Sequence, residues 1–484
     1  MQGLDELTSW HSDWKGKRAL VYGLGASGFS VADTLNELEC ELLVVANEIS
    51  APYRDLLSVL QIDFEVGVDN IFDRAKEFLP DFACVTPGIA PSDKLVGWLV
   101  ANQIPIVGDI ELAWRLRDKV TPAEWIVITG TNGKTTTTQM VEAMLVADGK
   151  RAISCGNIGT PVLDAIRDPQ GFDYLVVELS SFQLHYCGEI EPKVSALLNI
   201  AEDHIDWHQT FDAYIQAKGK VFNGTTGAII YNAEDATTRR LAEAANVRDE
   251  NVLAVSFTRG MPADLQVGYI EEFLIDRAFY GYRAAELPEL ANLDDIAQIG
   301  VVTPHLLANV AAAAAIARAC DTQASSIATA IRAFKQDRHR IEFVAERNGV
   351  LWFDDSKATN AHAASASLSS FESVVWIAGG LLKGVEIAPL VEEHQKRIKA
   401  AVVIGADREP VLEALRKFAP NTKVFEVAQV ERENVMSVAV QQASVFAEEG
   451  DVVLLAPAAA SMDQFKDYED RGNQFAKAIG ELHG

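Results

Sequence analysis

Cysteine is scarce in this chain, and the few cysteines that occur are not paired in the sequence. The 484 residues include five cysteines and no C-x-x-C motif. Unpaired spacing of this kind predicts reduced thiols and a cytoplasmic protein. The first residues, MQGLDELTSWHSDW, do not resemble a secretion signal, which agrees with that expectation. The cysteines are Cys40, Cys84, Cys155, Cys187 and Cys320.

Positive charge is scarce as well. Lysine and arginine together number 42 against 69 aspartates and glutamates, which leaves a formal net charge of −27. Nucleic acids and anionic membrane surfaces require a basic footprint on the protein, so neither is expected as a partner. An anionic small-molecule substrate must therefore meet positive groups that are placed locally, at its own binding site.

The sequence also lacks long apolar runs, low-complexity segments and short repeats. The most apolar long stretch, Leu306 to Ala319, includes Asn309 and Arg318. These polar residues and five consecutive alanines predict a helix of a soluble domain instead of a membrane span. We therefore expect no insertion into a membrane.

Three blocks of alternating strand and helix patterns are present instead. Hydrophobic residues make up 49% of the chain, and 484 residues are too many for one core. Continuous apolar strands that alternate with helices predict an α/β fold with mainly parallel sheets, and we expect three domains, at residues 1–112, 113–336 and 337–484. The expected strands are residues 18–23, 41–46, 125–130, 174–179, 193–200, 350–355, 374–380, 401–406 and 451–458.

The stretch TGTNGKTTTT, residues 129–138, lies at a predicted strand-to-helix turn. Phosphates bind at such turns because glycines let the backbone approach, a lysine neutralises charge and a hydroxyl reaches Mg²⁺. The loop is shorter than the standard P-loop, which would require a glycine in place of Ile128. We infer a phosphate site, and a glycine turn before a threonine-rich surface helix is the alternative.

Polar residues follow the next two expected strands. Glu178 ends one strand, and a carboxylate beside a phosphate loop is a typical ligand of nucleotide-bound Mg²⁺. The segment NIAEDHIDWH, residues 199–208, leaves a zinc site, a Mg²⁺ site and a hydrated polar loop open. Lys218, taken alone, is typical of a solvated helix lysine. His305 and Asn309 are four residues apart and share a helix face.

A second glycine pattern, Gly23-Leu24-Gly25-Ala26-Ser27-Gly28, follows the first expected strand. Nicotinamide enzymes use such a turn, but they also place an acid at the end of the next strand, and Glu48 comes late for that role. The pattern therefore favours a phosphate-bearing ligand over a redox cofactor or a purely structural turn.

Nine motifs along nearly the whole chain, taken together and in order, resemble the Mur ligase family. Within the family, VTPGIAP, IVGDIEL and SMDQFKDYEDRGNQF resemble the branch that adds D-glutamate, and the DNPR motif of the branch adding meso-diaminopimelate or lysine is absent. The nine motifs are TGTNGKTTTT, GNIGTP, VVELSSFQL, NIAEDHIDWH, YIQAKGK, PHLLANVAAA, QDRHRIE, DDSKATN and LAPAAASMDQFKDYEDRGNQF.

The resemblance implies an ATP-dependent amide ligase of cytoplasmic peptidoglycan synthesis, acting as a monomer. ATP would phosphorylate the terminal carboxylate of UDP-N-acetylmuramoyl-L-alanine, and the amine of D-glutamate would displace the phosphate. It also implies a Rossmann-like N-terminal domain for the uridylated substrate, a central P-loop domain for ATP, and a Rossmann-like C-terminal domain for D-glutamate and part of the nucleotide. Two Mg²⁺ sites belong to this expectation.

The resemblance further implies residue roles. Catalytic roles fall to Lys134, His204 and Lys218. One Mg²⁺ is expected on Thr135 and Glu178, and the other on His204 and a carbamylated Lys218. The residues expected to bind ATP are Gly130, Thr131, Asn132, Gly133, Lys134, Thr135, Thr136, Asn309, Arg340 and Asp355. The residues expected to bind the other substrates are Gly25, Ser27, Gly88, Asn157, Ser181, Lys357, Thr359, Lys383, Ser461 and Tyr468.

Three departures from the family pattern concern substrate contacts. Ala46-Asn47-Glu48 stands where the family often has Asp-x-Arg, GGLLKG replaces a GGxGKG-like loop, and Tyr468 stands where phenylalanine is frequent.

Other functions explain less of the sequence. A dinucleotide oxidoreductase leaves Lys134, Glu178 and His204 unexplained, and a P-loop motor or switch leaves the third block unexplained. A folylpolyglutamate synthetase-like ligase shares the phosphate loop but not the first block, and another amino-acid-adding Mur ligase stays open.

Overall fold

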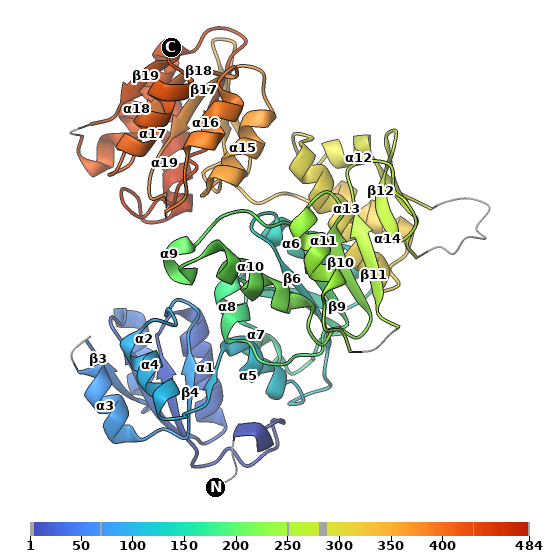
Figure 1. The fold of residues 1–484 in the computed structure, drawn as a ribbon, viewed down its shortest axis with the longest axis vertical. Coiled ribbons are helices and arrows are strands. Elements are labelled where there is room, and N and C mark those ends of the chain that lie inside the picture. Colours follow the sequence, from blue (N-terminus) through green and yellow to red (C-terminus); the bar gives the residue numbers. More distant parts are fainter. Residues whose placement is uncertain are drawn as a thin grey trace. The chain divides into compact units, whose positions relative to one another are not determined.

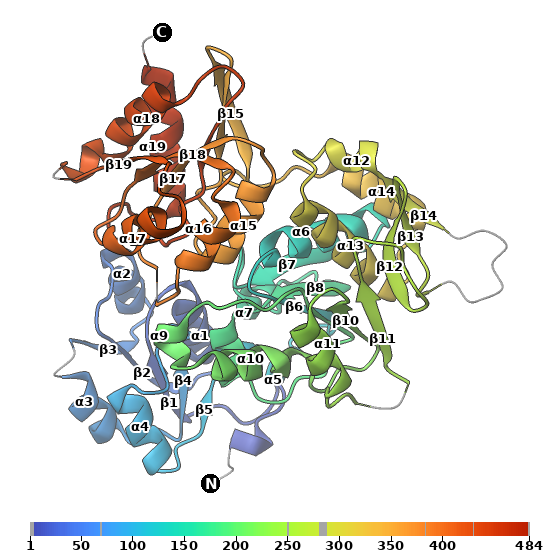
Figure 2. The ribbon, with the colours of Figure 1, turned by 45° about the horizontal axis from the view of Figure 1, so that its top comes forward.

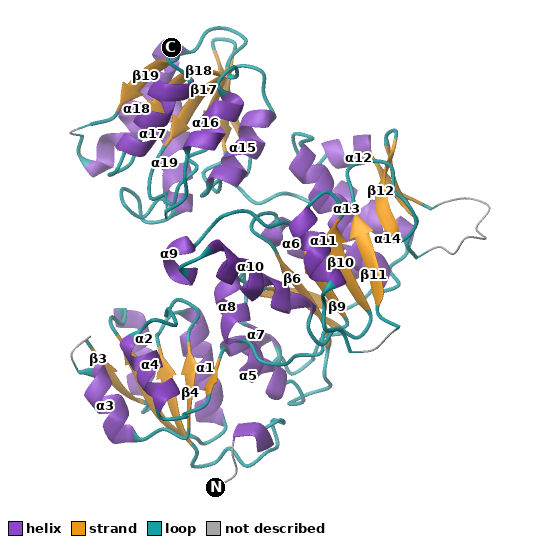
Figure 3. Cartoon of the chain, in the orientation of Figure 1, coloured by secondary structure: helices purple, strands orange, loops and turns teal. Residues whose placement is uncertain are grey.

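Three sheets, each covered by helices, make up the protein (Figure 1, Figure 3). The computed structural model describes residues 4–67, 70–248, 251–279, 288–382, 384–428 and 430–482. The predicted α/β class with mainly parallel sheets is confirmed. The chain divides into two compact units, the first comprising Met1–Ile200, Asp212–Ala291 and Val310–Ala330, and the second Ala201–Phe211, Asn292–Asn309 and Ile331–Gly484.

The N-terminal sheet has five parallel strands in the order β3-β2-β1-β4-β5. The chain reverses direction across the sheet beside β1, so the carboxyl ends of β1 and β4 flank a topological switch point, where ligands bind in such folds. The strands are β1 (Arg18–Tyr22), β2 (Glu41–Ala46), β3 (Asp63–Val66), β4 (Phe82–Val85) and β5 (Ile106–Val107). The helices are α1 (Ala26–Glu37), α2 (Ala51–Val59), α3 (Ile71–Phe78), α4 (Lys94–Ala101) and α5 (Asp109–Arg115).

The central sheet has nine strands in the order β14-β13-β12-β11-β10-β9-β6-β8-β7. Strands from β12 to β7 pair in parallel, whereas β13 runs antiparallel to β12. The strands are β6 (Glu124–Thr129), β7 (Ala152–Gly156), β8 (Tyr174–Glu178), β9 (Val194–Leu197), β10 (Ala228–Asn232), β11 (Leu253–Phe257), β12 (Gln266–Ile270), β13 (Phe273–Asp276) and β14 (Glu289–Asn292). The helices from this part of the chain are α6 (Lys134–Ala147), α7 (Val162–Ala165), α8 (Ser181–Tyr186), α9 (Ile205–His208), α10 (Phe211–Gly219), α11 (Ala236–Glu243), α12 (Leu293–Ala297), α13 (Pro304–Ala319) and α14 (Ala324–Ala333).

The C-terminal sheet has six strands in the order β15-β16-β20-β17-β18-β19, and only β15 is antiparallel to its neighbour. Helices α15, α16 and α17 pack on one face and α18 and α19 on the other (Figure 2). The strands are β15 (Glu342–Arg347), β16 (Val350–Asp354), β17 (Val374–Ala378), β18 (Ile398–Val403), β19 (Lys423–Glu426) and β20 (Val452–Leu455). The helices are α15 (Ala361–Ser369), α16 (Ala388–His394), α17 (Glu409–Phe418), α18 (Val435–Phe446) and α19 (Tyr468–Glu481).

The N-terminal and central sheets share one hydrophobic core cluster, which runs from Trp14 to Trp125 and beyond. Polar contacts reinforce this junction. Arg167 bonds Asp33 at 2.8 Å and Asp164 at 2.7 Å, and the Ser30 hydroxyl donates to Asp164 at 2.6 Å. Shared burial and a half-buried ion network explain why both sheets belong to one compact unit.

The alanine-rich stretch forms helix α13, as expected, and its alanines at positions 311–315 are fully buried. Within the described residues, no helix has the length and apolar character needed to cross a membrane.

The pair of Arg318 and Asp276 is the clearest buried ion pair of the central sheet. Arg318 Nε donates to Asp276 Oδ2 at 2.8 Å, and the Asp276 side chain is 0% exposed. We expect Arg318→Ala to lower the free energy of unfolding by about 3–5 kcal/mol, because it leaves a buried carboxylate uncompensated. Urea denaturation followed by circular dichroism measures this change.

A matched control is Arg277→Ala, which removes a pair with Asp264 whose two side chains are 36% and 50% exposed. Exposed pairs contribute about 0–1 kcal/mol, so this variant should unfold close to the wild type. Equal losses in both variants would contradict the role given to burial.

Candidate active site

The phosphate loop lies between β6 and α6, as the sequence predicts. Gly133 is the N-cap of α6 with φ +81°, a left-handed conformation that favours glycine, and it supplies no side-chain cap to the helix. A Cβ on Gly130 would come 3.0 Å from the Cβ of Leu198, so the loop also passes too close to its neighbour for a side chain. The result is a helix N-terminus of the kind that binds anions.

Asn199, at the end of the neighbouring strand β9, holds this loop in shape. Its backbone carbonyl accepts from Thr131 N at 2.9 Å, and its side chain accepts from Asn132 N at 2.8 Å and donates to Asn132 O at 3.0 Å. The Lys134 ammonium donates to Thr131 O at 2.8 Å, so it lies over the loop. Thr135 and Thr136, which follow in α6, are buried.

Glu178 ends β8 beside the phosphate loop, because β8 pairs with β6 and places Glu178 opposite Ile128. The side chain is 1% exposed. Asn157 Nδ2 donates to Glu178 Oε1 at 2.8 Å, while Oε2 is buried and has no hydrogen-bond partner among the described residues. Burying a carboxylate oxygen without a hydrogen-bond donor costs free energy unless a cation binds it. Glu178 therefore suits the role of a Mg²⁺ ligand.

Lys218, in α10, is buried at 2% exposure, contrary to its reading as a solvated helix lysine. Its ammonium donates to Gly130 O at 2.8 Å and to Thr129 Oγ1 at 3.1 Å. Thr129 Oγ1 in turn donates to the carbonyl of Leu179, the residue after Glu178. The lysine thus contacts the start of the phosphate loop. One of its partners, Thr129, bonds the residue that follows Glu178.

His204 belongs to the second unit, whereas Lys218 and Glu178 belong to the first. It precedes α9 with φ +55°, and its backbone N–H donates to the side chain of Asp203 at 2.9 Å. The other oxygen of Asp203 accepts from Asn360 Nδ2 at 3.1 Å. A metal shared by His204 and Lys218 therefore stays a prediction.

The N-terminal glycine pattern meets VTPG at the switch point. A Cβ on Gly23 would come 2.0 Å from Thr86 Oγ1, and one on Gly28 would come 2.3 Å from Gly23 O. Gly23 therefore permits close packing against Thr86 after β4, and Gly28 permits close approach of α1 to the end of β1. Gly25 is the N-cap of α1 without a side-chain cap, and Gly88 follows β4. Asn47 and Glu48 are exposed after β2.

Asp109 is a buried acid that sequence reasoning did not select. Gln183 Nε2 donates to its Oδ2 at 3.0 Å, and Gln183 also completes a capping box with Ser180 at the start of α8. Ser181, the first residue of α8, is buried. Burial raises the pKa of Asp109. Asp109 of the IVGDIEL motif thus links the N-terminal sheet to α8, the helix that follows Glu178. The sequence does not indicate this contact, because the two side chains meet only in the folded chain.

Arg340 lies in a strained segment of the second unit. His339 and Ile341, on either side of it, have φ of +66° and +46°, and the latter is unfavourable for a β-branched residue. The buried Nε of Arg340 has no hydrogen-bond partner within the described part of the chain. Strained backbone around a buried guanidinium nitrogen without a hydrogen-bond partner among the described residues is typical of a functional position, so Arg340 fits an anion contact.

Asp355 follows β16 and is 8% exposed. The hydroxyl of Ser367 donates to its Oδ2, and burial raises its pKa to about 6. A carboxylate that accepts hydroxyl donors is chemically suited to ribose. Asn309 and His305 lie in α13, and His305 packs edge to face on His362 with ring centroids 5.8 Å apart.

Lys357, Tyr468 and Ser461 come from two loops of the C-terminal sheet and the start of α19. The Lys357 ammonium lies 5.0 Å from the ring centroid of Tyr468. Thr359 N donates to the carbonyl of Lys357 at 2.9 Å. Ser461 is 3% exposed. It begins a turn, because its carbonyl accepts from Phe465 N at 2.9 Å. The N-cap of α19 is Asp467.

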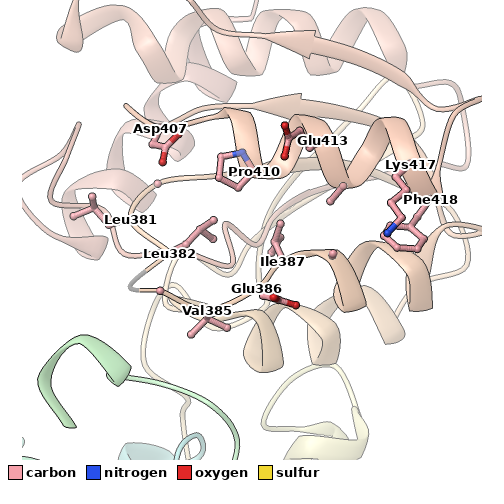
Figure 4. Close-up of a pocket in the computed structure, with 14 residues that line it drawn as sticks. Leu381, Leu382, Val385, Glu386, Ile387, Asp407, Pro410, Glu413, Lys417 and Phe418 are labelled. Atoms are coloured by element: carbon pink, nitrogen blue, oxygen red, sulfur yellow. The ribbon is translucent and has the colours of Figure 1, made fainter. Parts of the chain in front are cut away.

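Lys383 lies outside the described residues, but the rest of its GGLLKG loop borders a cavity of about 630 Å³ (Figure 4). Leu382, Val385 and Ile387 line one side of it, and Glu413 lines another. Glu386 and Asp407 add two more carboxylates. Lys417 lines the cavity too, so its apolar walls carry both acidic and basic groups.

Comparison with known proteins identifies the family. The model of the Mur ligase middle domain matches residues 128–317, and the model of the Mur ligase glutamate ligase domain matches residues 339–459. The UDP-N-acetylmuramoylalanine–D-glutamate ligase of Leifsonia xyli subsp. xyli is 47% identical, covering 99% of this chain and 96% of the relative. The ligase of the same name from Tropheryma whipplei is 43% identical, covering 100% and 99%.

Solved structures share the fold at low sequence identity. MurF from Acinetobacter baumannii gives a TM-score of 0.59 at 15% identity, covering 98% of this chain and 93% of that one. The UDP-N-acetylmuramate-alanine ligase MurC from Thermotoga maritima gives a TM-score of 0.57 at 16% identity, covering 96% and 99%. Full-length identity near one half, together with both domain matches, shows that this chain belongs to the Mur ligase family.

Proposed function

We propose that this chain is the ATP-dependent ligase that joins D-glutamate to UDP-N-acetylmuramoyl-L-alanine in peptidoglycan synthesis. The observation that carries the proposal is Glu178 Oε2, which is buried beside the Lys134 phosphate loop without a hydrogen-bond partner among the described residues. The names of relatives 43% to 47% identical over their full length support the choice of amino acid. We also propose a cytoplasmic monomer with domain boundaries near residues 112 and 336.

The reaction transfers the γ-phosphoryl group of ATP to a carboxylate oxygen of UDP-N-acetylmuramoyl-L-alanine and releases ADP. The amine of D-glutamate then attacks the acyl carbon, loses a proton, and inorganic phosphate leaves as the amide forms. Both steps bring anions together, so fixed positive groups at the transferring phosphoryl group supply most of the catalysis. Lys134 and the amides at the start of α6 hold the phosphates in this proposal.

The family requires Mg²⁺, and the donors beside the phosphate loop suit it. Thr135 and Glu178 would hold one ion, with Asn157 orienting Glu178 through its bond to Oε1. His204 and a carbamylated Lys218 would hold the second. When bound, the ions neutralise charge on the phosphoryl oxygens. Arg340 would contact the nucleotide phosphates, while Asp355 and Asn309 would hold the rest of the nucleotide.

The amino acid would bind in the second unit. Lys357 and Thr359 would meet one carboxylate of D-glutamate, and Ser461 with the backbone near Tyr468 the other. Lys383 is proposed for the first carboxylate from sequence alone. Gly25, Ser27 and Gly88 would hold the uridylated substrate, because they lie at the switch point of the N-terminal sheet.

Phosphate release tests the function as a whole. In the proposed ligase, release of inorganic phosphate from ATP requires both UDP-N-acetylmuramoyl-L-alanine and D-glutamate. A folylpolyglutamate synthetase-like enzyme would require a folate instead, and a Mur ligase of another specificity would prefer a different amino acid at equal concentration.

Lys134→Ala tests the phosphate loop. The Lys134 ammonium contacts the loop and no core atom is removed, so the fold should persist while the rate falls by a factor on the order of 10² to 10³. Stopped assays of ADP formation and near-ultraviolet circular dichroism measure the two properties. Unchanged turnover would contradict the assignment of Lys134.

Lys218→Ala tests the carbamate. Carbamylation adds CO₂ to a neutral amine, releases a proton and gives a carboxylate-like ligand. We expect an inactive variant whose turnover is partly restored by short carboxylic acids such as acetate and formate. Lys193→Ala is the control, because Lys193 is half-buried just before β9 and has no proposed role at the site, so its variant should keep full activity. Failure of rescue in a folded, metal-replete variant would remove the carbamate from the proposal.

Ser461→Ala tests the amino-acid pocket. Loss of a hydroxyl donor to one carboxylate should raise the KM for D-glutamate by about tenfold. The KM values for ATP and UDP-N-acetylmuramoyl-L-alanine should stay nearly unchanged, which initial-rate kinetics can resolve. If all three constants rise together, Ser461 supports the fold and not the pocket.

A further inference from the structure

Arg471 is completely buried in the first turn of α19, at 0% exposure. Three of its donors are accounted for by neutral oxygens. Nε donates to Ser356 Oγ at 2.9 Å, Nη2 to Ser356 O at 2.7 Å and Nη1 to Ala459 O at 3.0 Å. The guanidinium therefore bonds two segments that are about a hundred residues apart in the sequence.

Both segments carry residues proposed for D-glutamate. Ser356 lies in the loop after β16, next to Lys357 and three residues before Thr359. Ala459 lies in the loop after β20, two residues before Ser461. The Ser356 hydroxyl also donates to the carbonyl of Tyr468 at 2.8 Å. One side chain thus sets the spacing between the two loops and the start of α19.

The charge of Arg471 is not used in an ion pair within the described residues. Asp354, the nearby acid at the end of β16, bonds His339 Nδ1 at 2.6 Å instead. Burial lowers the pKa of Arg471 to about 10, so the guanidinium stays protonated at neutral pH. Its three hydrogen-bond partners are neutral, and its charge is opposed at longer range by Asp463, Asp354 and Asp355, so its contacts act on loop geometry.

We propose that Arg471 is a positioning residue of the amino-acid site, joining the loop of Lys357 and Thr359 to the loop of Ser461 at a fixed spacing. The inference rests on the proposed function, because that function assigns these loops to D-glutamate. The role requires a planar guanidinium, because its N–H donors point in fixed directions. A lysine ammonium is a point charge at the end of a flexible chain.

The packing of α19 supports a fixed position for the guanidinium. A Cβ on Gly472 would lie 2.1 Å from His339 Nδ1 and 2.6 Å from Asp354 Oδ2. The helix therefore begins in direct contact with the end of β16, where the Ser356 loop starts. Close approach at Gly472 leaves Arg471 little freedom to move relative to that loop.

Arg471→Lys tests the proposal in the full-length enzyme, since it keeps the charge and removes the fork. We expect the KM for D-glutamate to rise about tenfold or more, because a misplaced pocket loses contacts to both carboxylates. The KM values for ATP and UDP-N-acetylmuramoyl-L-alanine should change less than about twofold, in keeping with unaltered contacts. Hydroxylamine, which displaces phosphate from an acyl phosphate to give a hydroxamate, should trap the first intermediate at the wild-type rate without D-glutamate.

Arg432→Lys is the matched control. The exposed Arg432 donates to the carbonyls of Gln464 and Phe465, just after Ser461, but it does not reach the Ser356 loop. This variant should keep the wild-type KM for D-glutamate. Ser356→Ala is a milder second variant that removes one acceptor of Arg471 and should raise the same constant, with an effect that does not add fully to that of Arg471→Lys.

An unchanged KM for D-glutamate in both Arg471→Lys and Ser356→Ala would overturn the positioning role while leaving the ligase function intact. Equal loss of hydroxamate formation and D-glutamate binding, together with a lowered melting temperature, would overturn it in favour of a purely structural role. Phosphate release from the wild type that does not depend on D-glutamate would overturn the proposed function and this inference together.

Discussion

Repulsion between like charges is the constraint on which this architecture depends. The chain carries a net charge of −27, and every substrate of the proposed reaction is an anion. Desolvating an anion in a negative environment is strongly unfavourable unless donors are already in place. The protein meets this constraint locally, with helix N-termini and cations that are fixed before any substrate binds.

The phosphate loop shows that an anion site can be built mainly from backbone groups, with few charged side chains. Gly133 leaves the start of α6 without a side-chain cap, and Asn199 holds the loop through three hydrogen bonds. Lys134 and Lys218 each donate to carbonyls of the same loop, at Thr131 and Gly130. Backbone geometry therefore places both side chains before substrate binds, and a preorganised site needs little reorganisation during phosphoryl transfer.

Local patterns were sufficient to predict nine of the strands, the phosphate loop and the position of Glu178 at a strand end, whereas strands such as β3, β7 and β10 were not predicted. The spacing of apolar residues and glycines determines these features within one strand-loop-helix unit. Lys218 could not be read in this way, because its helix alone is typical of a solvated lysine, whereas the folded chain buries it against Thr129. The burial of Asp109 also depends on segments far apart in the sequence, since its hydrogen-bond donor is Gln183.

Two kinds of buried arginine illustrate what the sequence conceals. Arg318 bonds the carboxylate of Asp276, so its charge is cancelled and its contribution is to stability. Arg471 bonds a hydroxyl and two carbonyls, so its contacts fix loop geometry without cancelling its charge. Both residues lie in helices, and their side chains are chemically identical. The hydrogen-bond partners distinguish an ion pair that stabilises the fold from a cation that positions two loops, and tertiary contacts determine those partners.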